Sequence, residues 1–454
     1  MQIINPATGE LIREISEDNR ETLSKKFQLL KDTHTGWSAL GIKQRVKILQ
    51  DFSNGLEKNI ESLAAVLTTE IGKPLQQSRN EINGARTRIQ WLTENAEKYL
   101  AEEEMTKTPE LTEKISYDPL GVICNISAWN YPWLVGVNVF VTALLAGNAV
   151  MYKPSEYAIL TGFEIERLLK KSGIPEGVFQ LAVGAREVGE LLLDLPFDGY
   201  FFTGSYKTGK YIYEKCASKM VPCQLEMGGK DPLYVANDVA DIKQVAEATA
   251  DGAFYNNGQS CCSVERIYVQ EDVYDAYLRE FVEIVRSWKI GLPTEAGIYF
   301  GPLTRKAQLE VLERQVRDAV AKGARILTGG KRIDGKGYFF EPTILADVTQ
   351  DMLVMKEESF GPVIGIMKVK DDEEAVQLMA DTEYGLTAAV YSSDQQRAEK
   401  LIRQFNTGSG YWNCCDRVSA PLPWSGRKHS GFGSALSHAG LLSFVRPKAW
   451  HMRR

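Results

Sequence analysis

The chain has 454 residues, of which 44% are hydrophobic and 25% charged, as in ordinary globular proteins. Lys and Arg number 53 against 59 Asp and Glu, and the net charge of −6 argues against nucleic acid or an anionic membrane as the main partner. The most apolar region, residues 121–152, is broken by asparagines and a proline, so no membrane span is expected. The length predicts two or more domains.

The first residues lack the charged and apolar parts of a signal peptide, and none of the seven cysteines forms a Cys-x-x-Cys pair. We therefore expect a cytoplasmic protein with reduced thiols. Four histidines are spread too thinly for a zinc site, so no metal is expected.

Helical patterns open the chain and cover about residues 19–31, 41–69 and 74–100. Within the second pattern, five apolar residues at helical spacing predict one buried stripe. They are Leu56, Ile60, Leu63, Ala64 and Leu67. A short extended piece follows at residues 113–117.

From residue 121 onward, short apolar runs alternate with amphipathic helices. The predicted strands cover residues 122–126, 149–152, 178–182, 200–202 and 224–226. The predicted helices cover residues 134–145, 156–171, 187–193 and 206–217. This alternation indicates βα units on a mostly parallel sheet, with ligands beyond the carboxyl ends of the strands.

A second alternation runs from about residue 232 to 413 and predicts a second α/β domain. Its predicted strands cover residues 233–235, 267–269, 363–369, 388–391 and 409–413. A loop-rich segment at residues 418–434 and a last extended run at residues 441–450 close the chain. This run and the piece at 113–117 are candidates for pairing with another subunit.

Cys261 and Cys262 stand in a small polar loop between a helical pattern at residues 241–256 and a predicted strand at residues 267–269. A thiol between two regular elements is a candidate nucleophile, although most free cysteines only fill the core.

Two other residues could support such a thiol. Glu226 ends a predicted strand just before two glycines, where a carboxylate could activate water. Asn130 offers an amide donor in a turn, which could stabilise an oxyanion. The glycines of residues 202–209, between a strand and a helix, could admit a phosphate, although each motif alone is also explained by a turn.

Taken together, the motifs resemble the NAD(P)-dependent aldehyde dehydrogenase superfamily of the non-acylating, hydrolytic type. The resemblance covers nearly the whole chain, and its most specific parts are Gly258-Gln-Ser-Cys261 and Leu225-Glu-Met-Gly-Gly-Lys230. It implies a Rossmann-like dinucleotide-binding domain (residues 1–105 and 120–228) and an α/β catalytic domain that carries the nucleophile (229–435). It also implies a small β oligomerisation flap (106–119 and 436–454) in a homodimer or homotetramer.

By this resemblance Cys261 is the nucleophile and forms a thiohemiacetal and then a thioester. Asn130 and the Cys261 N–H hold the oxyanion, and Glu226 activates the hydrolytic water. Cys262 is then a neighbour of the site.

The resemblance also implies a set of cofactor residues. Trp129, Lys153 and Glu156 lie by the adenosine ribose, Gly204, Ser205 and Gly209 by the pyrophosphate, and Glu358 and Phe360 by the nicotinamide ribose. The Glu156 carboxylate can accept from ribose hydroxyls but would repel a 2′-phosphate, whereas Lys153 and Lys207 act the other way. We expect NAD, with NADP as the alternative.

Six residues are expected by position to line the substrate entrance: Tyr131, Val135, Asn138, Ser260, Cys262 and Trp424. The set is aromatic and contains no cation, which favours an uncharged aliphatic or aromatic aldehyde. Succinate-semialdehyde members of the family typically place an Arg here, so that substrate is the alternative. Betaine aldehyde is less favoured, because Asn138 leaves the aromatic cage incomplete.

Val139 and Ala435 stand where many family members carry an interacting Lys and Glu behind the general base. We expect water or backbone groups to take over the removal of the proton from Glu226. Two rival functions are a CoA-acylating aldehyde dehydrogenase, which typically lacks the general-base Glu, and a non-catalytic structural protein on the same fold.

Overall fold

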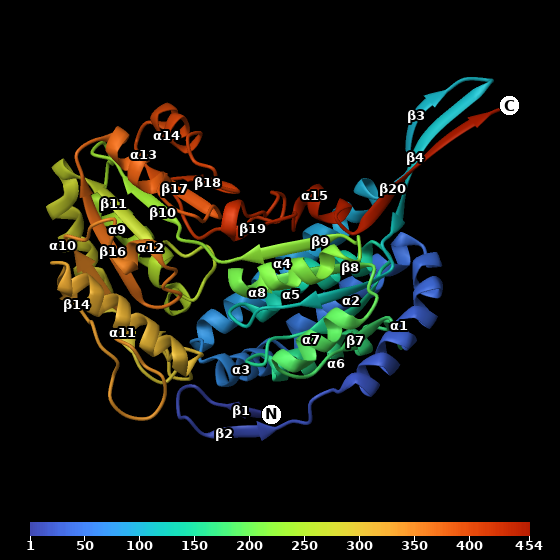
Figure 1. Cartoon of the computed structure of the whole chain (residues 1–454), viewed down its shortest axis with the longest axis horizontal. Coiled ribbons are helices and arrows are strands. Elements are labelled where there is room, and N and C mark those ends of the chain that lie inside the picture. The colour runs from blue at the N-terminus through green and yellow to red at the C-terminus, as the bar shows by residue number, and fades with distance from the viewer.

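The computed structural model describes residues 1–454 as two lobes and a projecting flap (Figure 1). The first lobe contains six strands: β5 (Val122–Ile126), β6 (Ala149–Lys153), β7 (Phe179–Leu181), β8 (Gly199–Gly204), β9 (Cys223–Met227) and β19 (Gly431–Phe432). They form one sheet in the order β19-β9-β8-β5-β6-β7. All neighbouring strands are parallel except β19, which runs antiparallel to β9.

Eight helices cover this sheet: α1 (Arg20–Ala39), α2 (Ile42–Lys58), α3 (Ile60–Ile71), α4 (Leu75–Tyr99), α5 (Pro132–Leu145), α6 (Ile159–Lys171), α7 (Arg186–Asp194) and α8 (Tyr206–Ala217). Because strand side chains alternate, β5 serves two cores. Val122 and Cys124 pack with side chains of α1, α7 and α8. Ile123 packs on the other face, with residues of α2 to α6.

The helix predicted over residues 41–69 is in fact two helices, α2 and α3, which meet at Asn59. The side-chain amide of Asn59 donates to the Gly55 carbonyl at 2.7 Å, an interaction that competes with helical backbone bonding. The predicted stripe is therefore divided between two helices, and its member Ile60 is only partly buried.

The second lobe contains a seven-stranded sheet in the order β14-β15-β16-β11-β10-β17-β18. Its strands are β10 (Pro232–Val235), β11 (Arg266–Gln270), β14 (Arg325–Thr328), β15 (Thr343–Ala346), β16 (Val363–Val369), β17 (Thr387–Tyr391) and β18 (Ser409–Trp412). The helices are α9 (Ile242–Phe254), α10 (Glu271–Ser287), α11 (Lys306–Ala321), α12 (Leu353–Lys356), α13 (Asp372–Ala380) and α14 (Gln395–Ile402). The five predicted strands are all present, and β14 and β15 are additional.

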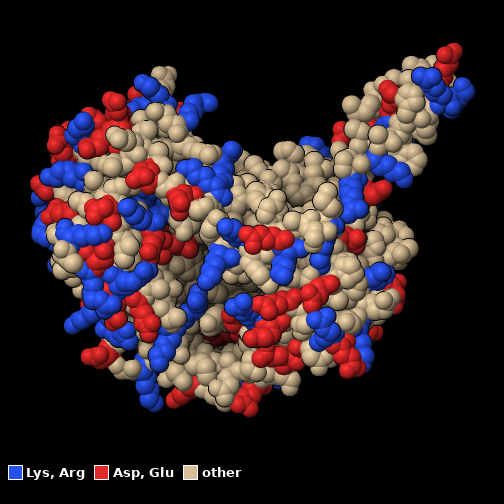
Figure 2. Space-filling model, viewed as in Figure 1, with Lys and Arg blue, Asp and Glu red and all other residues tan.

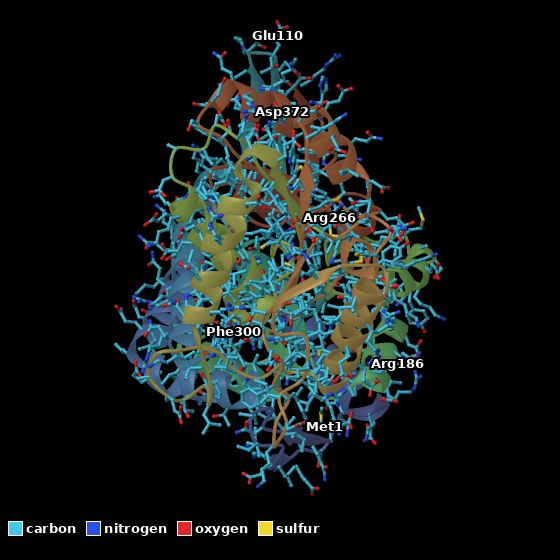
Figure 3. All side chains as sticks on the ribbon, turned by 90° about the vertical axis from the view of Figure 1, so that its left-hand side faces the viewer. Met1, Glu110, Arg186, Arg266, Phe300 and Asp372 are labelled. Carbon is cyan, nitrogen blue, oxygen red and sulfur yellow. The ribbon has the colours of Figure 1, made fainter.

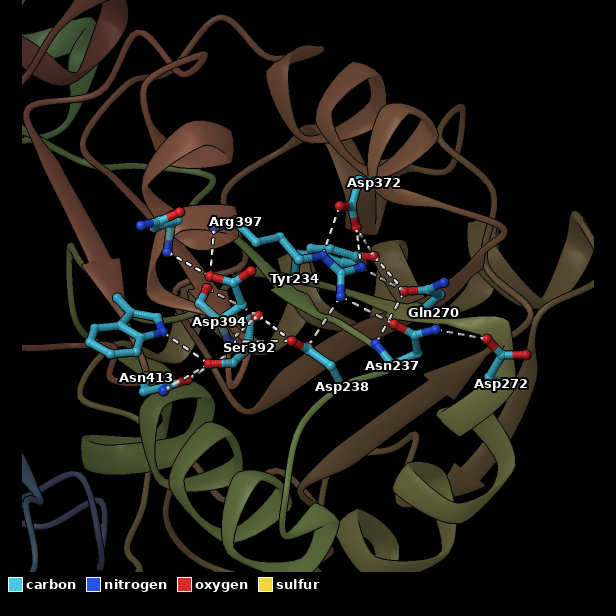
Figure 4. Close-up of polar contacts among 12 residues, drawn as sticks. Tyr234, Asn237, Asp238, Gln270, Asp272, Asp372, Ser392, Asp394, Arg397 and Asn413 are labelled. Atoms are coloured by element: carbon cyan, nitrogen blue, oxygen red, sulfur yellow. Dashed lines mark hydrogen bonds and ion pairs between the residues drawn. The ribbon is translucent and has the colours of Figure 1, made fainter.

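A polar network joins the strand ends of this lobe to the helices beside them (Figure 4). The Arg397 guanidinium of α14 donates to both carboxylate oxygens of Asp372, at 2.6 and 2.8 Å, and pairs with Asp238 at 3.2 Å. The Tyr234 hydroxyl also donates to Asp372, at 2.8 Å. These bonds fix α13 and α14 against β10, away from the polar loop that holds Cys261.

The flap is a three-stranded sheet of β3 (Glu103–Lys107), β4 (Leu111–Pro119) and β20 (Val445–Arg453), in the order β20-β4-β3. It projects from the first lobe, with Glu110 at its tip and Met1 at the opposite end of the molecule (Figures 1 and 3). The extended run predicted at 441–450 is wrong at its start, because helix α15 (Ser437–Leu442) precedes β20.

The remaining elements are short: β1 (Gln2–Ile4), β2 (Leu11–Glu14), β12 (Lys289–Ile290), β13 (Ile298–Phe300) and the 3-10 turns η1 (Tyr255–Gly258) and η2 (Lys428–Ser430). The α/β class with a separate β flap is as predicted. Strand β19 lies within residues 229–435 but joins the sheet of the first lobe, and the exact domain boundaries stay a prediction. None of the helices combines the length and the apolar composition needed to cross a membrane.

Candidate active site

The predicted catalytic residues meet where the first lobe passes into the second. Strand β9 points towards the second lobe (Figure 1), and residues 228–231 cross from it to β10. The molecular surface is hollowed along the junction of the lobes (Figure 2). A Cβ on Gly229 would lie 3.1 Å from the Cys261 carbonyl oxygen, so the crossing segment directly contacts the cysteine loop.

The cysteine loop begins with three consecutive residues in the left-handed region. Asn256, Asn257 and Gly258 have φ of 54°, 57° and 67°. Asparagine tolerates this region better than most residues. At Gly258 a side chain is excluded as well, because its Cβ would lie 2.5 Å from the Gly361 carbonyl oxygen. The reversal that presents Cys261 therefore depends on these residue types.

Side-chain amides hold the loop in this shape. The Asn257 amide donates to the carbonyls of residues 301 and 302, at 3.0 and 2.8 Å. Gln259 donates from Nε2 to the Asn256 carbonyl and accepts the Thr304 N–H at 3.0 Å. The Cys261 N–H donates to no protein acceptor and is free to bind an oxyanion.

Asn130 lies against the same loop. Its side-chain amide donates to the Gln259 carbonyl at 3.0 Å, and its backbone carbonyl accepts from the Lys73 ammonium at 2.8 Å. Lys73 forms a fully buried ion pair with Glu81, which also accepts the Trp133 N–H at 2.9 Å. This pair, which the sequence did not reveal, fixes the turn that carries Asn130 and the start of α5.

Glu226 is buried, and neither of its carboxylate oxygens has a hydrogen-bond partner. Burial raises the pKa of this carboxyl well above its ordinary value, and the negative charge of Cys261 raises it further. Val139 and Ala435, at the positions of the absent Lys and Glu, are buried apolar residues. The carboxyl is thus close to the thiol, and the Gln224 side chain is the one nearby donor that lowers its pKa.

The predicted substrate residues form two groups. Tyr131 is the N-cap of α5, Val135 and Asn138 lie on its first two turns, and the Lys73 ammonium lies 3.8 Å from the Tyr131 ring centroid. Trp424 packs with Cys261 and Cys262 in a small apolar cluster.

Ser260 and Cys262 both donate to one carboxylate oxygen of Asp416, at 3.0 Å each. Burial raises the pKa of Asp416 to about 6, and these two donors oppose the shift. The sequence analysis missed Asp416, although it directly follows the cysteines at 414 and 415 in a loop after a predicted strand.

Arg88 of α4 was also not predicted, and it brings a cation into contact with Asn138, although none of the six predicted entrance residues is itself cationic. Its Nη1 donates to Asn138 Oδ1 at 2.9 Å and to the Leu134 carbonyl at 3.2 Å. The sequence did carry a signal, because Arg88 lies on the buried face of its helix with Ala85 and Ile89.

The predicted cofactor residues lie on both lobes. Trp129 packs edge-to-face on Phe360, with ring centroids 5.5 Å apart. Gly204 and Ser205 lead into α8, whose N-terminus Ser205 caps through Thr208 N–H. Lys153 is buried, and Glu156 accepts from the Ser155 hydroxyl at 3.2 Å.

Close-packed glycines and strained backbone occur among the predicted cofactor residues. A Cβ on Gly228 would lie 1.9 Å from Glu358 Oε1, so the backbone there must approach this carboxyl without a side chain. Burial raises the pKa of Glu358 to about 8. Phe360 has a φ of 45°, and its N–H donates to Glu265 at 3.0 Å. The residues fit a dinucleotide, with a helix N-terminus for its phosphates and aromatic faces around it.

The chain is similar to known proteins in sequence and in fold. A family model described as the aldehyde dehydrogenase family matches residues 1–450. Aminoaldehyde dehydrogenase 2 of Pisum sativum is 35% identical over 98% of this chain and 91% of its own length. A succinate semialdehyde dehydrogenase [NAD(P)+] of Escherichia coli is 32% identical over 97% and 95%. A structure of betaine aldehyde dehydrogenase from Staphylococcus aureus with NAD+ is 30% identical, covers 100% of this chain and 94% of its own, and has a TM-score of 0.95.

Proposed function

The chain belongs to the aldehyde dehydrogenase family, and on that basis we propose that it oxidises an aldehyde to the carboxylic acid with NAD(P)+ and water. One observation carries the proposal. A thiol, an amide donor and an unpaired buried carboxyl, from Cys261, Asn130 and Glu226, lie at one junction of the two lobes.

The first step is attack of the Cys261 thiolate on the aldehyde carbon, which gives a thiohemiacetal. The Cys261 N–H and the Asn130 amide stabilise the oxyanion, because neither the N–H nor the second amide hydrogen is taken by a protein acceptor. Bound NAD(P)+, which the predicted residues Trp129, Ser205 and Phe360 would help to hold, would supply the hydride acceptor, and the acyl group would remain on Cys261 as a thioester.

The second step is hydrolysis of that thioester. Glu226 takes a proton from water, and the hydroxide attacks the acyl carbon and releases the acid. Both carboxylate oxygens are closed to solvent in this conformation, so the side chain must turn towards the thioester, or water must enter, before the carboxylate can accept from water. We propose that water or backbone groups then remove the proton, since Val139 and Ala435 cannot.

NAD is the proposed first choice of cofactor, with NADP as the alternative. Glu156 beside Lys153 supports NAD, because a carboxylate at the ribose would repel a 2′-phosphate. Relatives include proteins described with NAD(P)+ and one structure with NAD+.

The relatives' names cover aminoaldehydes, succinate semialdehyde and betaine aldehyde, so at this identity they leave the substrate open. The sequence favoured an uncharged aliphatic or aromatic aldehyde, because no predicted entrance residue was cationic. Arg88 removes that reason, since its guanidinium is bonded to Asn138.

We also propose a cytoplasmic compartment and a homodimer or homotetramer. All seven cysteines are free, as expected in a reducing compartment. The flap leaves β20 and β3 as outer strands of a projecting sheet, and such edges can pair with another chain.

The decisive experiment is a steady-state assay of cofactor reduction with a panel of aldehydes, for the wild type and Cys261→Ser. We expect turnover in the wild type and none in the variant. Product analysis should yield the free acid, with or without CoA. Turnover that survives in Cys261→Ser would refute the assignment of the nucleophile, acyl-CoA as the product would favour the acylating rival, and inactivity of the wild type would favour the non-catalytic one.

A further inference from the structure

Arg88 is a buried cation whose hydrogen-bonding capacity is largely unused. Only Nη1 donates within the protein, to Asn138 Oδ1 and the Leu134 carbonyl, and both acceptors are neutral. No Asp or Glu forms an ion pair with it, whereas the buried ammonium of Lys73 is paired with Glu81. Buried charges are normally paired, so Arg88 calls for a partner that the chain does not supply.

The free nitrogen atoms of Arg88 face space rather than packed protein. Nε and Nη2 have no protein acceptor, and both atoms keep some exposure to solvent. Water-sized molecules can therefore reach them, while Nη1 keeps the guanidinium plane in a fixed position. A guanidinium presented in this way matches the two oxygens of a carboxylate.

The place of Arg88 is the substrate side of the nucleophile. Its partner Asn138 lies on α5, one helical turn beyond Leu134 and two beyond Tyr131. Burial lowers the pKa of Arg88 to about 10, and the largest effects that oppose the shift come from the thiolate forms of Cys262 and Cys261. The guanidinium is thus in electrostatic range of the thiol that attacks the aldehyde.

We propose that Arg88 binds the carboxylate of an aldehyde substrate, so that the preferred substrates are ω-oxo acids. The proposal rests on the proposed function, because it names a substrate class for the same site. Asn138 orients the guanidinium, and the aldehyde end reaches Cys261.

Asp416 offers the opposite choice, recognition of an ammonium group, but its surroundings favour it less. Ser260 and Cys262 already donate to one of its oxygens. Burial raises the pKa of Asp416 to about 6, which weakens its negative charge in mildly acidic conditions. Arg88 by contrast stays charged at any physiological pH and has two nitrogen atoms to spare.

The test compares kcat/KM for 4-oxobutanoate, 5-oxopentanoate, the uncharged methyl 4-oxobutanoate, and 4-aminobutanal. In the wild type we expect an oxo acid to be best. Arg88→Met should lower its kcat/KM by about 10- to 100-fold, the usual worth of a charge-assisted hydrogen bond, and change that of the methyl ester less than about threefold. Arg88→Lys should restore part of the loss.

The matched control is Arg86→Met. It removes a guanidinium from the same helix, but Arg86 is paired with Glu57 at 2.8 Å. The Arg86→Met substitution should therefore leave kcat/KM unchanged for every substrate. Equal losses for the oxo acid and the ester in Arg88→Met would overturn the proposal, because Arg88 would then act on folding or on the thiol. A wild-type preference for 4-aminobutanal that Asp416→Asn abolishes would overturn it in favour of a cationic substrate.

A binding assay keeps the two proposals separable. Succinate has the carboxylate but no aldehyde, and we expect it to slow alkylation of Cys261 by iodoacetamide in the wild type and in Arg86→Met, but not in Arg88→Met. If no aldehyde is oxidised but this protection is seen, the proposed function fails and the carboxylate site stands. If aldehydes are oxidised and succinate gives no Arg88-dependent protection, the carboxylate site fails alone. Should Arg88→Met not fold, Arg88→Lys and Arg88→Gln take its place.

Discussion

Two buried arginines of this protein differ in how fully their guanidinium groups are bonded. Arg266, in the interior of the second lobe (Figure 3), is closed to solvent and donates from Nε, Nη1 and Nη2. Its acceptors are the Tyr268 hydroxyl and the backbone carbonyls of Lys230, Leu378, Met379 and Asp381. Arg88, beside the cysteine loop, donates from Nη1 alone.

The same contrast separates the buried carboxyl groups. Glu265 pairs with Lys230 at 2.6 Å and accepts the N–H groups of Ser359 and Phe360. Glu226 has no partner at either oxygen. A fully bonded buried polar group stabilises the fold, whereas an unbonded one destabilises it and is typical of functional sites. Glu226 and Arg88, the two groups of this comparison whose bonding is incomplete, both lie within electrostatic range of Cys261.

The largest expected effect comes from Glu226→Gln. The amide cannot take a proton from water, so thioester hydrolysis should slow by about 10² to 10⁴. The first turnover should still release reduced cofactor, and a stopped-flow burst followed by a very slow steady state would demonstrate this. Loss of the burst itself would show that Glu226 acts before the thioester forms.

The free energy of unfolding should fall more when Arg266 is replaced than when Arg88 is replaced. Arg266→Met removes five hydrogen bonds, three of them fully buried, and should lower the free energy of unfolding by roughly 4 kcal/mol. Arg88→Met leaves two acceptors but removes an unpaired buried charge, so we expect a loss below about 1.5 kcal/mol. Urea denaturation of both variants measures the difference. Equal losses would mean that Arg88 is a scaffold residue like Arg266.

Glu226 should also shape the pH dependence of stability. The folded pKa is raised above the ordinary 4.5, so the unfolded chain loses this proton first. The stability that the protonated carboxyl contributes is fully present below pH 4.5 and is lost as the pH rises towards the folded pKa, at up to about 1.4 kcal/mol per pH unit. Glu226→Gln should remove this decline in urea denaturation across pH. If Glu226→Gln leaves the pH profile of stability unchanged, another group must cause the decline.

The smallest effect is expected when the Lys and Glu that many family members carry behind the general base are introduced. Val139→Lys with Ala435→Glu supplies two opposite charges at buried positions behind Glu226. If water or backbone groups already remove the proton, hydrolysis should change less than about threefold, as single-turnover measurements across pH would show. A large gain in rate would mean that the natural enzyme is handicapped there.

Much of the fold could be predicted because its strands and helices carry local patterns. The apolar run of β16 and the amphipathic pattern of α8 were predicted to the residue. Strand β14 is an edge strand with half of its residues exposed, and β3 is largely charged, so neither has an apolar run. Their pairing with β15 and β4 is a tertiary effect.

For the site, the motif residues were predictable and their supports were not. Cys261 and Glu226 stand in short, specific motifs. Lys73 and Arg88 act on residues 57 and 50 positions away, and in the sequence they are only charged residues within helical patterns. A charge on the apolar face of a predicted helix is the signal that could have identified Arg88.

The long-range contacts of the cysteine loop also determine when Cys261 acquires its folded surroundings. Asn256 N–H donates to Gln77, 179 positions earlier, while Ser260 donates to Asp416, 156 positions later. Contacts of such long separation form late in folding. During synthesis the thiol therefore stays without its shaped surroundings until almost the whole chain has been made. A truncated chain that ends before residue 416 should contain Cys261 as an ordinary cysteine.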